Sequence, residues 1–94
     1  MVFDISEIKN LGDYKKKSEE SRDLYYKGEK VFLVVNKNTI EIRTDDQLGR
    51  LLREKYESVM ESRYFGKGGI EIVLAGQLNQ AELYDLVRLS YNLS

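Results

Sequence analysis

The stretch KVFLVVNKNTIEIR, Lys30 to Arg43, decides the fold of this chain of 94 residues. Its first half is apolar on both faces of an extended chain, which is typical of a central strand covered on each side. In its second half two isoleucines point to one face, while Thr39, Glu41 and Arg43 point to the other. This alternation predicts a half-buried strand in a sheet with one solvated face. The polar cluster Asn36 to Asn38 between the two halves predicts a hairpin turn.

Strand and helix signals continue on both sides of this hairpin. Upstream, the run DLYY followed by a turn at Gly28 predicts another strand. Downstream, Thr44 to Gln47 fits a capping box that opens an amphipathic helix, Ile70 to Leu74 predicts a fourth strand, and a capping box at Asn79 opens the last helix. We therefore predict a compact single α+β domain over residues 1–94, in which helices pack on a mainly antiparallel four-stranded sheet. The predicted order is helical N-terminus-β-β-β-α-β-α.

The first part of the chain differs in character from the rest. Apolar residues at intervals of three predict a short amphipathic helix near Ser6–Leu11. In the run DYKKKSEESRD, Asp13 to Asp23, lysines and glutamates lie three to four residues apart, which favours a solvated helix. Lys15 to Lys17 then form either an exposed helical face or a patch that docks a phosphate or a partner.

Composition excludes several kinds of chemistry. The chain has no histidine and no cysteine, so neither a histidine base nor a thiolate nucleophile is available. A metal site would need oxygen ligands alone, and the carboxylates do not follow the spacing of an EF-hand. We therefore expect a non-enzymatic protein without a metal site or a cofactor. The net charge of −1, from 15 basic and 16 acidic residues, disfavours a strongly basic nucleic-acid binder but permits a local basic patch.

No segment of the sequence favours a membrane. The longest apolar run, Val31 to Val35, is far short of the ~20 residues that span a bilayer. Residues Met1 to Asp4 show neither the basic nor the apolar region of a secretory signal. We therefore expect a cytoplasmic protein, and the oligomeric state stays open.

Three stretches within residues 23–93 carry a resemblance to a known family: KVFLVVNKNTIEIRTDDQLGRLLREKY, RYFGKGGIEIVL and ELYDLVRLSYNL. A K-x-F strand that begins at Lys30 precedes a strand that ends in a basic residue, Arg43. A loop with an aromatic and a basic residue leads into the next strand, and the chain closes with a helix that ends in Ser90 to Leu93. In order and spacing these features resemble the MmcQ/YjbR-like family of small bacterial proteins.

The resemblance implies helices packed on an antiparallel sheet, in agreement with the elements predicted above. It also implies a DNA-binding role, because members are described as DNA-binding on the strength of wing-like hairpins in the fold.

The residues expected to contact DNA are the cations and the aromatic residue of two turns and their strands: Lys37, Arg43, Arg63, Tyr64 and Lys67. In the glycine-rich loop after Ser62, backbone amides and cations would meet a phosphate while Tyr64 stacks on a base. Alternatively, Tyr64 or Phe65 fills the core beneath a mobile loop and the cations are solvated. Lys37, at the tip of its turn, is either a phosphate contact or ordinary surface.

The seven tyrosines support a second hypothesis, a protein-interaction or accessory domain with no affinity for nucleic acid. Tyr84 lies at the border of the apolar face of the last helix, where a partner could reach it. Alternatively, these tyrosines rim the core and direct their hydroxyl groups outward.

Overall fold

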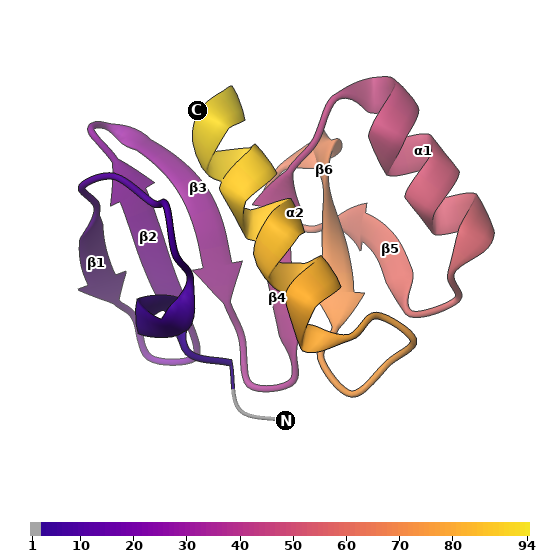
Figure 1. Ribbon diagram of the computed structural model, residues 1–94, viewed down its shortest axis with the longest axis horizontal. Coiled ribbons are helices and arrows are strands. Elements are labelled where there is room, and N and C mark those ends of the chain that lie inside the picture. Colours follow the sequence, from indigo (N-terminus) through magenta and orange to yellow (C-terminus); the bar gives the residue numbers. More distant parts are fainter. Residues whose placement is uncertain (1–2) are drawn as a thin grey trace.

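A computed structural model describes residues 3–94, which build one six-stranded antiparallel sheet with two α-helices on one of its faces (Figure 1). In chain order the elements are η1 (Ile5–Glu7), β1 (Lys15–Ser18), β2 (Asp23–Lys27), β3 (Lys30–Val35), β4 (Thr39–Arg43), α1 (Asp46–Lys55), β5 (Val59–Ser62), β6 (Gly66–Val73) and α2 (Gln80–Leu93). Across the sheet the strands follow the order β1-β2-β3-β4-β6-β5, so β1 and β5 are the edges. The expectation of no secretory signal rests in part on Met1 and Val2, which lie outside the described residues.

The predicted four-stranded sheet is wrong, because the sheet gains a strand at each edge. Strand β1 occupies the lysine run that was predicted as a solvated helix, and all of its residues are exposed. It pairs with β2 through a short hairpin, from Lys15 opposite Tyr26 to Ser18 opposite Asp23. Lysine-rich edge strands resist pairing with another chain, so the charge pattern that favours a helix surface also suits an edge.

Strand β5 is the second addition. Its sequence, VMES, is short and has one β-branched residue, so it carries little strand signal of its own. It forms because the turn that follows it folds back and pairs it with β6, from Val59 opposite Ile72 to Ser62 opposite Gly66. The helix predicted near Ser6–Leu11 is also wrong, since only the single turn of η1 forms there.

The main core lies between the sheet and the helices. Isoleucines of β4 and β6 pair directly across the sheet, Ile40 with Ile72 and Ile42 with Ile70, and all four are fully buried. Helix α2 crosses this face over β3 and β4, and α1 packs beside it on β5 and β6 (Figure 1). The segment around η1 joins the same core.

The two predicted capping boxes have different outcomes. At α2 the box is confirmed: the Asn79 side chain accepts from the Glu82 backbone N–H, and the Glu82 carboxylate accepts from that of Asn79. At α1 the cap is Asp45, not Thr44, and its carboxylate accepts from the Leu48 N–H at 2.7 Å. Thr44 is instead buried beside Gly49 in the first turn of the helix. A Cβ added at Gly49 would lie 2.7 Å from the Thr44 hydroxyl.

A bulge in β3 gives α2 a second role. Tyr25 pairs with Leu33 and Tyr26 with Val31, so Phe32 has no partner on β2. The fully buried Ser90 of α2 reaches this point: its hydroxyl donates to the Phe32 carbonyl (2.5 Å) and accepts from the Arg43 N–H (2.8 Å). A serine of the last helix thus satisfies two strand groups beside the bulge.

On the opposite face of the sheet, no helix of the described residues packs. A smaller cluster of Leu24, Val31 and Val34 lies there, partly covered by Tyr26 and Phe65. We call this side of the sheet, opposite the two helices, the helix-free face. Within residues 3–94, neither helix has the length and apolar character needed to cross a bilayer.

Candidate functional site

Two glutamates lie directly opposite each other on the helix-free face. Glu41 of β4 and Glu71 of β6 are each the centre of an Ile-Glu-Ile triplet, and the two triplets pair in register. Both glutamates are almost fully buried, so the prediction that Glu41 faces solvent is wrong. Like charges in directly opposed positions destabilise a sheet unless other groups compensate them.

Three polar groups from two parts of the chain compensate Glu41. Its carboxylate accepts from the Asn36 side-chain amide at 2.9 Å, the Ser62 hydroxyl at 2.8 Å and the Tyr64 backbone N–H at 2.9 Å. Burial by itself raises the pKa of this carboxyl, but the three hydrogen bonds and the charge of Arg63 together outweigh it and lower the pKa below the ordinary value. Glu41 is therefore a fixed carboxylate, not a proton donor, at neutral pH.

Glu71 is compensated by an arginine that folds back over the sheet. Arg63 donates to both carboxylate oxygens, from Nε at 2.9 Å and Nη2 at 2.8 Å, and Thr39 donates its hydroxyl at 2.8 Å. The Arg63 side chain stays 74% exposed although its partner is only 5% exposed. A bidentate pair of this kind fixes the guanidinium plane, and Nη1 is left to face solvent.

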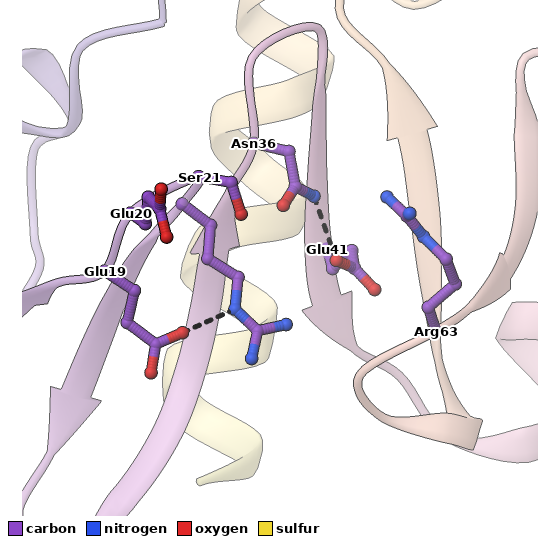
Figure 2. Close-up of a pocket in the computed structure, with 7 residues that line it drawn as sticks. Glu19, Glu20, Ser21, Asn36, Glu41 and Arg63 are labelled. Carbon is purple, nitrogen blue, oxygen red and sulfur yellow. Dashed lines mark hydrogen bonds and ion pairs between the residues drawn. The ribbon is translucent and has the colours of Figure 1, made fainter.

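Beside this pair of glutamates the surface has a hollow with a volume of about 440 Å³. Figure 2 shows the hollow from the helix-free face, with α2 behind the strands. Glu19 and Glu20 of the β1–β2 turn border it on one side and Arg63 of the β5–β6 turn borders it on the other. The remaining lining residues are Ser21, Arg22, Asn36 and Glu41.

Beside this hollow, Arg22 of its lining begins a chain of contacts that joins two cations and two aromatic rings. The Arg22 guanidinium lies 5.3 Å from the centre of the Tyr64 ring, and its Nε donates to Glu19 at 2.7 Å. Tyr64 meets Phe65 edge to face at 4.9 Å, and the Arg43 guanidinium lies 4.9 Å from the Phe65 ring centre. The turns β1–β2 and β5–β6, about forty residues apart in the sequence, therefore meet on one face.

The structure brings together three of the five residues predicted to contact DNA, and places a fourth at the same end of the sheet. Arg43, Arg63 and Tyr64 gather on the helix-free face, and Lys67 is exposed at the start of β6. Lys37 lies at the other end of β4, in the β3–β4 turn, beside a different hollow. Arg43 is partly engaged in the fold, because its Nε donates to the Val31 carbonyl.

Burial in the structure distinguishes between the alternatives that the sequence left open for the aromatic residues. Phe65 packs on the smaller cluster, whereas Tyr64 is 38% exposed. Tyr84, predicted within reach of a partner, is buried, and its hydroxyl bonds to Gln80 and Glu7.

Sequence reasoning missed the polar residues that hold the site: Arg22, Asn36, Thr39, Glu41, Ser62 and Glu71. One signal was present, since the same Ile-Glu-Ile triplet occurs in two predicted strands. Lone glutamates in otherwise apolar strands are seldom buried unless paired, so a matched pair points to strand neighbours. Nothing local marks Arg22, because its role depends on a turn far away in the chain.

The side chains at this site offer hydrogen-bond donors and acceptors. All four oxygens of the two buried carboxylates accept hydrogen bonds from other groups of the protein. Among residues 3–94 no group of three or more potential metal ligands gathers. Free donors of two arginines and free acceptors of two exposed glutamates border the hollow instead.

The lowered pKa of Glu41 predicts a dependence of stability on pH. A carboxyl whose pKa is depressed in the folded state contributes stability above its unfolded pKa and loses it as the pH falls through the folded value. We expect the difference in free energy of unfolding between wild type and Glu41→Gln to shrink steadily below about pH 5. Urea unfolding across this range measures it, with Glu61→Gln as the exposed control. An unchanged difference down to about pH 3 would contradict the assignment.

Comparison with known proteins supports the fold. No family model matches the chain, and no curated protein matches it in sequence. In structure it is similar to the Deinococcus radiodurans protein DR2400, described as a DUF419 domain, with 17% sequence identity and a TM-score of 0.80. The match covers 94% of this chain and 72% of that one. DUF419 is the MmcQ/YjbR family, so the shared fold is the one that the sequence resemblance implied.

Proposed function

We propose that the protein is a non-enzymatic binding module of the MmcQ/YjbR type that contacts nucleic acid through the helix-free face of its sheet. The observation that carries this proposal is the gathering of Arg43, Arg63 and Tyr64 on a face that no described helix covers. Open sheet faces that combine cations with aromatic rings are used by several nucleic-acid modules.

The edge strand adds to this surface. Lys15 pairs with Tyr26 and Lys17 pairs with Leu24, so both lysines point to the helix-free face. The run of three lysines thus divides between the two faces of the sheet. The two buried glutamates of this face are each held by donors and present little charge to solvent.

The charge balance sets the strength that we expect. Glu19 and Glu20 border the hollow, and the chain as a whole is close to neutral. We therefore expect weak binding with a modest salt dependence, equivalent to about two or three neutralised phosphates.

The test is fluorescence anisotropy of labelled DNA at low and near-physiological salt. The double variant Lys17→Gln/Lys67→Gln removes two exposed cations that hold nothing else in place among the described residues. We expect weaker binding at low salt and a salt slope reduced by about 1 to 2. Arg63→Ala is unsuitable, because it would leave Glu71 buried without its partner.

The matched control is Lys9→Gln/Lys55→Gln, which removes the same charge from exposed positions on the N-terminal segment and α1. It should bind as wild type does. Absence of binding at low salt, or an affinity that does not change with salt, would overturn the proposal.

One observation favours the second candidate, a protein-interaction surface. Met60 of β5 pairs with Glu71, so it points to the helix-free face, where it is 43% exposed. Methionine, tyrosine and arginine are enriched in protein interfaces. Under this candidate, nucleic acid would not bind and the protein would associate with itself or with a partner as its concentration rises.

A further inference from the structure

We propose that the hollow beside Tyr64 holds one unpaired base, so that the helix-free face binds single-stranded nucleic acid in preference to duplex. This inference rests on the proposed function and names the class of nucleic acid that the site takes. Three features of the structure support it: a hairpin that is pinned to the sheet, a stacking platform and a set of hydrogen-bonding groups suited to the edge of a base.

The β5–β6 turn is held down and does not project as a wing. The Tyr64 N–H donates to Glu41, the Phe65 N–H donates to the Ser62 hydroxyl at 2.8 Å, and Arg63 is tied to Glu71. The Phe65 ring packs on the smaller cluster. A β-hairpin that reads a duplex as a wing inserts into one of its grooves, and this hairpin would have to leave the sheet to do so.

Arg22 and Tyr64 together offer a stacking platform at the hollow, with Arg22 as the member that lines it. Arg22 lines the hollow and its guanidinium lies over the Tyr64 ring, so a base in the hollow would stack on the guanidinium that the ring supports from behind. Unpaired bases stack on aromatic rings and on arginine planes, whereas the bases of a duplex are already stacked on each other.

The hydrogen-bonding groups around the hollow suit a base better than a phosphate. Arg22 and Arg63 each use part of the guanidinium for a carboxylate, which leaves N–H groups for a carbonyl or ring nitrogen. On the border opposite Arg63, Glu19 and Glu20 repel phosphate but accept hydrogen bonds from an exocyclic amino group. Cytosine has an exocyclic amino group for the glutamates, and a carbonyl and a ring nitrogen for the arginines. Thymine lacks an exocyclic amino group.

The experiment compares labelled oligodeoxycytidine, oligodeoxythymidine of the same length and a DNA hairpin duplex by anisotropy at low salt. We expect oligodeoxycytidine to bind about tenfold more tightly than the duplex, and more tightly than oligodeoxythymidine. Arg22→Gln and Tyr64→Leu should each weaken single-strand binding about tenfold. Arg50→Gln, which also removes an arginine paired with an acid on the surface, is the control and should have no effect.

The outcomes separate the two proposals. If no nucleic acid binds, both fail. If the duplex binds as tightly as the single strands, or Arg22→Gln has no effect while Lys17→Gln/Lys67→Gln weakens binding, the base pocket is overturned and the proposed function stands. Should Tyr64→Leu lose its fold by circular dichroism, Arg22→Gln decides alone, because Arg22 lies outside both hydrophobic clusters.

Discussion

Replacement of Glu41 with alanine is expected to lower the free energy of unfolding by about 3 to 5 kcal/mol. The substitution removes the acceptor for the Asn36 amide, the Ser62 hydroxyl and the Tyr64 N–H, and each buried donor left without a partner costs about 1 to 3 kcal/mol. Repulsion from Glu71 is relieved, but Arg63 already compensates that charge, so the relief is smaller than the loss.

Urea denaturation followed by circular dichroism measures this effect. Glu61→Ala is the matched control, because Glu61 lies on the edge strand β5 with its side chain 51% exposed and bonded only to Arg53. The control should change the free energy of unfolding by less than about 1 kcal/mol. If Glu41→Ala stayed within that range as well, the polar network around Glu41 would contribute nothing to the fold.

The hydrogen bonds of Glu41 that stabilise the fold also hold residues of the candidate site in position. Glu41 holds the β5–β6 turn down through the Tyr64 N–H, and this turn carries both Tyr64 and Arg63. Loss of the carboxylate should therefore release the turn from the helix-free face. The pair of buried glutamates thus fixes the surface above it.

Replacement of Ser90 with alanine is expected to lower the free energy of unfolding by about 2 to 4 kcal/mol. The Ser90 hydroxyl bridges the Phe32 carbonyl of β3 and the Arg43 N–H of β4. It does so beside the bulge in β3, just beyond the last residue pair between β3 and β4. Alanine leaves a buried carbonyl and a buried N–H without partners, and space for a replacing water is limited because Ser90 is fully buried.

Thermal and urea unfolding of Ser90→Ala test this prediction against Ser94→Ala. Ser94 also donates its hydroxyl to a backbone carbonyl, that of Ser90, but at the end of the helix. The control should lose less than about 1 kcal/mol. Equal losses in the two variants would show that the bridge to the strands adds nothing beyond an ordinary hydroxyl.

Several features of this protein were determined by its sequence alone. The apolar periodicity of Lys30 to Arg43 and of Ile70 to Leu74 specified three strands at the middle of the sheet, and the capping box at Asn79 specified the start of α2. Each of these signals is local, because the alternation of side chains and the hydrogen bonds of a cap involve residues a few positions apart. The lack of histidine and cysteine likewise limits the chemistry in any fold.

Tertiary structure alone decided the edges of the sheet and the site. Lys15 to Ser18 and Val59 to Ser62 become strands only because neighbouring strands offer unpaired backbone groups, which outweigh weak local preferences. Glu41 is buried because the pairing of β4 with β6 places it opposite Glu71 and beneath the β5–β6 turn. Such register is set by contacts between segments that are far apart in the chain, and no local pattern encodes it.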